Sequence, residues 1–192
     1  MMTALTELQR DALQELMNIS MGQAANALAR LIDAKISLSI PKIVVVDASE
    51  FQQMFQSERY WFTRQSFLGS VKGEVLTLLA RAGTETIGGL LDYPLPLDAR
   101  SKEELLLELA NILAGACLHG FSSQLGLPAK LSMPTMYSVQ HRHSDSFNWA
   151  STLLLEVEFQ LEGTAFDSRI VICLAGPSVG VLLQQLNALL ES

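Results

Sequence analysis

Charged residues and cysteines are scarce in this sequence. Charged side chains make up only 17% of its 192 residues against 49% apolar residues, which excludes a disordered chain and requires a sizeable core. The net charge of -7 works against binding the phosphate backbone of a nucleic acid, so we expect no nucleic-acid partner. Cys117 and Cys173 lie in separate apolar stretches without a CxxC spacing, and we expect core thiols in a reducing compartment.

Long apolar runs and nucleotide-binding motifs are also missing. No stretch approaches the roughly 20 uncharged apolar residues of a membrane-spanning helix. The first residues carry Glu7, Asp11 and Glu15 in place of the basic region and apolar run of a signal peptide. Neither GxGxxG nor GxxxxGK[ST] occurs. We therefore expect a cytoplasmic protein that does not insert into a membrane.

The apolar periodicity predicts the same order of elements twice. The first half is expected to hold a long helix over 5–32, strands over 35–48, a hairpin over 66–83 and a helix over 84–93. The second half repeats this order over 102–124, 128–140, 151–176 and 177–190. Residues 49–65 show neither period, and we expect a short helix and a loop there.

A seam over residues 93–101, with two prolines and no period, divides the chain nearly in half. Neither half has enough residues to bury its apolar faces well alone. We therefore expect one domain over 1–192, made of two repeats over roughly 1–95 and 101–192. The expected fold class is α/β (α+β), an internally duplicated pseudo-twofold domain with two long helices packed on a continuous, mostly antiparallel sheet.

Each long helix carries a Glu-x-x-Asn pair followed at the same distance by a proline. The first copy is Glu15, Asn18 and Pro41, and the second copy is Glu108, Asn111 and Pro134. The proline stands 23 residues after the asparagine in both copies. Such a pattern arises by chance at roughly one position in several thousand, so two equivalent occurrences mark a duplicated site.

The residue types of this pair suit the positioning of a water molecule. Residues three or four apart share one helix face, so Asp11 extends the first pair and Glu104 the second into a polar ridge. A solvated face, or a capping or buried structural asparagine, is the alternative interpretation. Because asparagine is unfavourable inside a helix, its presence in both copies favours a function. A carboxamide beside a carboxylate offers no nucleophile, so it suits orienting a water better than covalent catalysis.

Gly22 and Gly115 occupy matching places, four residues after each asparagine. Glycine inside a helix is destabilising unless something must come close to the backbone. We expect the two glycines to mark where the long helices, or a helix and the sheet, pack backbone to backbone.

The two copies resemble the signature of the CheC, CheX and FliY phosphatases, which dephosphorylate the chemotaxis response regulator CheY. That signature is Asp or Ser, three residues, Glu, two residues, Asn, 22 residues and Pro. The first copy matches it in full from Asp11 to Pro41, whereas the second has Glu104 where Asp or Ser is usual. The resemblance covers nearly the whole chain, although Ser20 stands where a glycine is common. Since no further domain of the flagellar-switch kind follows the second repeat, we expect a stand-alone CheC-like or CheX-like protein.

The resemblance implies an activity, a set of site residues and a partner. Asn18 or Asn111 would position the hydrolytic water in the active site of a phosphorylated CheY-type regulator. Glu15 or Glu108 would pair with the regulator's lysine. The residues assigned to binding are Asp11, Glu104, Pro41 and Pro134. No cofactor of its own is expected, since Mg2+ would belong to the regulator. The alternative is a non-catalytic module that binds the regulator or a CheD-like deamidase.

Two other groups of residues attract attention but are assigned no site. His141 and His143 stand near Asp145, yet their spacing fits no familiar metal site, and we expect a solvated loop. The aromatic cluster of residues 60–62 is expected to pack in the core.

Overall fold

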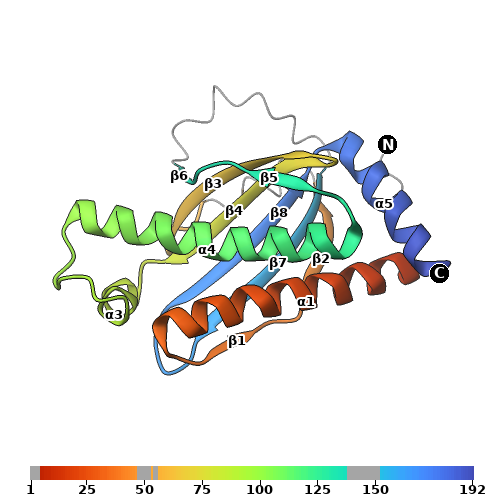
Figure 1. Ribbon diagram of the computed structural model, residues 1–192. Coiled ribbons are helices and arrows are strands. Elements are labelled where there is room, and N and C mark those ends of the chain that lie inside the picture. The colour runs from red at the N-terminus through yellow and green to blue at the C-terminus, as the bar shows by residue number, and fades with distance from the viewer. Residues whose placement is uncertain (1–4, 47–52, 54–55, 138–151) are drawn as a thin grey trace.

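Two long helices lie side by side on one face of an eight-stranded sheet (Figure 1). The computed structural model describes residues 5–46, 53, 56–137 and 152–192. The helices are α1 (Glu7–Ile32) and α4 (Ala99–Leu125), and every strand pairing among the described residues is antiparallel. The fold class expected from the sequence is therefore confirmed.

The strands follow the duplicated order of the sequence. The first half supplies β1 (Ile36–Leu38), β2 (Lys42–Val46), β3 (Tyr60–Gly69) and β4 (Lys72–Ala80). The second half supplies β5 (Ala129–Leu131), β6 (Thr135–Met136), β7 (Thr152–Leu161) and β8 (Asp167–Leu174). Two shorter helices, α3 (Thr84–Leu90) and α5 (Gly176–Leu190), follow β4 and β8.

The two halves exchange their short strands. In the order β1-β7-β8-β4-β3-β5, β1 lies on β7 and β5 lies on β3, while β2 also pairs with β7 and β6 with β3. Leu38 stands opposite Phe159, and its counterpart Leu131 stands opposite Phe67. The sheet is thus symmetric about the β4–β8 pair, and each half completes the sheet edge of the other.

Side-chain caps fix where both long helices begin. The Thr6 hydroxyl accepts a hydrogen bond from the Gln9 backbone at 3.2 Å, and the Gln9 side chain accepts one from the Thr6 backbone at 3.0 Å. The Asp98 carboxylate accepts a hydrogen bond from the Ser101 backbone at 2.7 Å. The caps satisfy backbone N–H groups of the first turn, whereas the apolar residues decide which helix face turns toward the core.

The close approach of α1 to α4 occurs at Gly120. A Cβ on this glycine would lie 3.0 Å from the Cα of Ser20, so the two backbones nearly touch there. The Gln124 amide donates to the Ser20 hydroxyl at 2.8 Å and to the Leu16 carbonyl at 3.0 Å. Residues late in α4 therefore meet residues in the first half of α1, and the helices run antiparallel.

The packing role expected for Gly22 and Gly115 is wrong. A Cβ built on either residue would meet no atom of the described part of the chain within 4 Å. Both glycines face open space along their helices, whereas Gly120 makes the helix contact that was expected of them. The matching positions of the two glycines predicted that a side chain is unfavourable at both places. The sequence could not show whether the neighbour that requires this lies inside or outside the protein.

The core lies between the helices and the sheet, with further buried residues along the central strands. Its largest fully buried side chains include Leu13, Met17, Met21, Phe67, Leu109, Leu113, Phe121 and Phe159. Cys117 and Cys173 are free and buried, as expected, and burial raises the pKa of both thiols. By length and composition α4 could cross a membrane, contrary to expectation, but 56% of its most apolar window is buried inside the protein. That burial is typical of a core helix.

The expectation of a short helix and a loop over 49–65 is wrong from Tyr60 onward, where β3 begins, and residues 49–52 and 54–55 lie outside the described residues. β3 pairs with β4 from Tyr60 to Leu68. Tyr60, Phe62 and Thr63 are all buried, so this stretch lacks the alternation of a half-exposed strand. The aromatic residues belong to the core as expected, with Trp61 partly buried against it.

Candidate functional site

The first copy of the motif lies on the outer face of α1. Asp11, Glu15 and Asn18 are all exposed and follow one another along one side of the helix. Leu13 and Met17, which point the other way, are fully buried and fix the orientation of this ridge. Within the described part of the chain, none of the three polar side chains has a hydrogen-bond or ion-pair partner. The first site is therefore an open, unsupported polar surface.

Pro41 belongs to a turn that is fastened to the flank of α1. The Gln14 amide donates to the Pro41 carbonyl at 2.8 Å, and Arg10 donates to the Ile43 carbonyl at 3.0 Å. A shallow hollow of about 370 Å³ lies between these side chains and the turn. Pro41 itself is buried, whereas the preceding Ile40 is 75% exposed. The proline thus shapes the turn beside the ridge.

The second copy of the motif lies on the outer face of α4, and its side chains have partners. Glu108 accepts a hydrogen bond from the Tyr93 hydroxyl at 2.7 Å. Burial, followed by this hydrogen bond and the Glu108 charge, raises the pKa of Tyr93 to about 12, so the tyrosine is a donor at neutral pH. Asn111 accepts a hydrogen bond at its Oδ1 from the Gln65 amide at 3.1 Å. The second site is therefore a connected polar group.

Glu104, which departs from the signature, pairs with Arg100 one turn earlier on α4 at 3.1 Å. Both side chains are more than half exposed. Exposed pairs of this spacing contribute only about 0.3–0.5 kcal/mol. Arg100 therefore holds Glu104 only weakly.

Gln65 connects Asn111 to the segment that carries Pro134. Its Nε2 also donates to the Ser132 carbonyl at 3.1 Å, and the Ser132 hydroxyl accepts from the Ser66 backbone at 2.9 Å. Gln65 lies in the middle of β3 and is only 1% exposed. The structure thus brings together the second asparagine and the segment of its proline through one buried amide.

Neither Gln65 nor Tyr93 was expected at the site. Gln65 stands in a strand 46 residues before Asn111, and Tyr93 stands in the seam. The one sequence signal for Gln65 is a polar residue in a buried stretch of β3, where its neighbour on the same face is Phe67. No signal in the sequence distinguishes Tyr93 from any other aromatic residue of a loop.

Bare backbone and exposed apolar side chains border both ridges. Gly22 and Gly115 follow the asparagines by one turn and leave open space above each helix. Ile40 and Met133, which directly precede the two prolines, are 75% and 79% exposed. Ile19, beside Asn18, is 43% exposed. Each polar ridge is therefore bordered by surface that can accept a partner closely.

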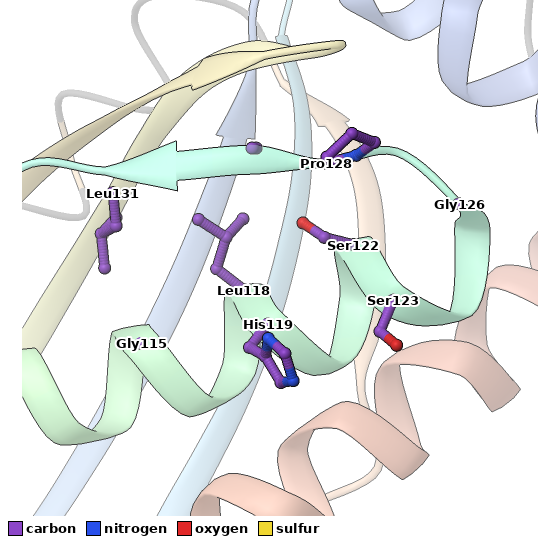
Figure 2. A pocket seen from close by; sticks show the side chains of 9 residues that line it. Gly115, Leu118, His119, Ser122, Ser123, Gly126, Pro128 and Leu131 are labelled. Carbon is purple, nitrogen blue, oxygen red and sulfur yellow. The ribbon is translucent and has the colours of Figure 1, made fainter.

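A larger hollow of about 450 Å³ begins at Gly115 and runs between α4 and β5 (Figure 2). In Figure 2 the Ser122 hydroxyl points toward the strand, and His119 lies on the outer side of the helix. The lining contains no carboxylate and no cysteine. The described residues contain no group of three or more His, Cys, Asp or Glu side chains placed so that they could hold a metal ion. His141, His143 and Asp145 lie outside the described residues.

Sequence comparison identifies a family in the first repeat. Residues 8–45 match the model of the CheC-like family, a range that contains the whole first motif. Over 87 residues the chain is 29% identical to the flagellar motor switch phosphatase FliY of Bacillus subtilis. That alignment covers 45% of this chain and 23% of the relative, so the chain matches only about a quarter of the relative's length.

Similar solved structures cover nearly the whole chain. FliY of Thermotoga maritima has a TM-score of 0.75 at 17% identity, over 97% of this chain and 99% of that one. The FliM middle domain of H. pylori has a TM-score of 0.68 at 9% identity, over 94% and 99%. A chain of the CheX-CheY-BeF3-Mg2+ complex of Borrelia burgdorferi has a TM-score of 0.55 at 15% identity, over 84% and 96%. The resemblance noted in the sequence is thus confirmed: residues 8–45 match the CheC-like family, and the chain has the fold of the FliY, FliM and CheX structures.

Proposed function

We propose that this chain is a phosphatase that accelerates the dephosphorylation of a phosphorylated CheY-type receiver domain in the cytoplasm, and so adjusts chemotaxis signalling. The observation that carries this proposal is the pair of exposed Glu-x-x-Asn ridges in equivalent places on two helices whose other faces are buried. A side chain projecting from a rigid helix can enter the active site of another protein. The similarity to FliY, a phosphatase by name, and to a chain of a CheX–CheY complex supports the activity and the partner.

The chemistry required of this chain is the positioning of a water molecule. Asn18 and Asn111 each offer an amide donor and a carbonyl acceptor, which can hold a water in line with a phosphoryl group. Glu15 and Glu108 offer carboxylates to a lysine of the receiver. The aspartyl phosphate and the Mg2+ would both belong to the receiver. Positioning alone can supply a large rate increase, because it removes the entropy cost of bringing reactants together.

The glycines support a close approach by the partner. A helical glycine is less favourable than alanine by about 1 kcal/mol, and no contact with the described residues accounts for Gly22 or Gly115. A receiver loop lying over the open space beside each asparagine would account for both. Ile40 and Met133 would then add apolar contacts at the edge of the same interface.

A second candidate function is a binding module that acts on a regulator or on a CheD-like deamidase without hydrolysis. The fold similarity to the FliM middle domain favours it, since a FliM chain of this fold is known in a complex with FliG. The polar ridges would then bind the partner without promoting reaction. The two candidates differ in whether the lifetime of a phosphorylated receiver changes.

Phosphate release from a CheY-type receiver phosphorylated by acetyl phosphate tests the proposal. We expect the protein to accelerate release and the double variant Asn18→Ala/Asn111→Ala to lose this effect. Both asparagines are exposed and alanine favours the helix, so the variant should fold, which circular dichroism can check. Undiminished acceleration by the double variant would show that the site is misassigned. Binding of the receiver without any change in its decay would instead support the binding module.

A further inference from the structure

The two copies of the motif differ in the residue that stands beneath the asparagine. Gln65 of β3 lies two residues before Phe67, which stands opposite Leu131. In the other half, Val157 of β7 lies two residues before Phe159, which stands opposite Leu38. Gln65 and Val157 therefore occupy equivalent places in the sheet. Both are 1% exposed, but only the side chain of Gln65 can form a hydrogen bond.

We propose that Gln65 is a positioning residue that fixes the side-chain amide of Asn111 and makes the second site the faster of the two. This inference rests on the proposed phosphatase function. It reverses the order suggested by the signature, in which the first copy is complete. For the rate at the second site, the hydrogen bonds that hold Glu108 and Asn111 matter more than the replacement of the usual Asp or Ser by Glu104.

The hydrogen bonds of Gln65 define which way the Asn111 amide faces. The Ser132 carbonyl can only accept, so the nitrogen end of Gln65 must lie there, at 3.1 Å. The same nitrogen lies 3.1 Å from Asn111, which must then present its Oδ1 as acceptor. The Asn111 amino group is thereby turned away from the sheet, and one lone pair of Oδ1 stays free. A donor and an acceptor are presented outward in a single orientation.

Gln65 is unfavourable for the fold in one respect, which argues for a use outside stability. Its Oε1 is buried and has no hydrogen-bond partner in the described part of the chain. A buried polar atom without a partner destabilises a protein. The equivalent Val157 fills its place in β7 without that cost. The amide at position 65 is thus explained by what it does to Asn111.

The expected consequence is a smaller loss of side-chain freedom when the second site goes from the bound complex to the transition state. Asn18 has no partner within the described residues and must be ordered as the transition state forms. Asn111 is ordered beforehand, and Tyr93 also holds Glu108 in place. Preorganised groups lower the barrier of the chemical step more than they strengthen binding. Loss of Gln65 should therefore lower kcat and leave KM nearly unchanged.

The test uses Gln65→Met, which keeps the length of the side chain and removes its donor, in an Asn18→Ala background where only the second site works. We expect kcat for dephosphorylation of a CheY-type receiver to fall about tenfold, with KM within twofold. The matched control is Val157→Met in an Asn111→Ala background, where we expect no change in kcat. Gln65→Val, which copies the other repeat, replaces Gln65→Met if the latter does not fold.

A second readout does not depend on activity. The side-chain amide resonances of Asn111 in a 15N-labelled protein should move toward those of a free exposed asparagine in Gln65→Met. Unchanged Asn111 resonances would overturn the positioning role, and changed resonances with unchanged kcat would overturn its effect on rate. If the unaltered protein does not accelerate dephosphorylation at all, the proposed function fails, while the resonances still decide whether Gln65 holds Asn111.

Discussion

The first copy of the motif carries the complete sequence signature but no side-chain partners in the described part of the chain. The second departs from the signature at Glu104, yet Tyr93 holds its glutamate and Gln65 holds its asparagine. The two copies therefore differ in two separate properties. One is whether the site has the residue types of the signature, and the other is whether hydrogen bonds hold their side chains in place. The signature records only the first property. The supporting residues come from elsewhere in the chain and decide the second.

The largest expected effect is the difference between the two single asparagine variants. We expect Asn111→Ala to lower the acceleration of receiver dephosphorylation by about tenfold and Asn18→Ala by less than twofold, because the preorganised site carries most of the turnover. Phosphate release at saturating receiver measures both. If Asn18→Ala lost more of the acceleration than Asn111→Ala, the first site would be the faster one, as the complete signature suggests.

A smaller effect, common to both sites, is expected on replacing the bare glycines. Gly22→Ala and Gly115→Ala should each raise the free energy of unfolding by about 0.5–1 kcal/mol, since a Cβ meets none of the described residues within 4 Å and alanine favours the helix. The same variants should lower activity several-fold by keeping the receiver away from the helix. Urea unfolding and phosphate release test the two halves of this prediction. Gly120→Ala, at the helix contact, is the matched control and should lower stability.

The smallest expected effect concerns the support of Glu108. Tyr93→Phe removes one hydrogen bond to a carboxylate that is partly in solvent, so we expect it to lower the free energy of unfolding by about 1 kcal/mol or less. We also expect a twofold to threefold lower rate at the second site. Phe keeps the packing of the ring, so a larger loss of stability would mean that Tyr93 acts through something other than this bond.

The contribution of Tyr93 should depend on pH in a defined direction. Its pKa is about 12 in the folded protein against a reference value of 10.0, so folding favours the protonated hydroxyl. The stabilisation is therefore fully present below about pH 10 and is lost as the pH rises from there through 12. Unfolding free energies of the protein and of Tyr93→Phe should converge over this range. A difference that persists unchanged at pH 12 would exclude the hydroxyl as its source.

The helices, the duplication and the polar ridges could be predicted because each is a local pattern. Apolar residues at helical spacing predict α1 and α4, and the repeated Asn-to-Pro distance predicts two equivalent sites. β3 escaped prediction over residues 60–65 because it is buried on both faces there and has no alternation. The exchange of short strands between the halves is a long-range pairing that no local pattern specifies.

The support of the second site could not be predicted for the same reason. Gln65 and Tyr93 reach their partners across 46 and 15 residues, and neither belongs to a motif. Gly22 and Gly115 were identified as places of close approach but assigned to the interior. A glycine in a helix indicates that a larger side chain is unfavourable at that position. Only the structure shows that the open space beside Gly22 and Gly115 faces away from the protein interior.

The exchanged strands give the seam between the halves a particular importance. Because β1 and β2 complete the edge of β7, and β5 and β6 complete that of β3, a single repeat could close its sheet only against a second copy of itself. In such a symmetric pair every substitution would appear twice, once in each site. Joining the copies through residues 93–101 removes that constraint, so a glutamine can enter one strand while a valine occupies the other. Covalent linkage is what permits one fold to hold an ordered site and an adaptable site together.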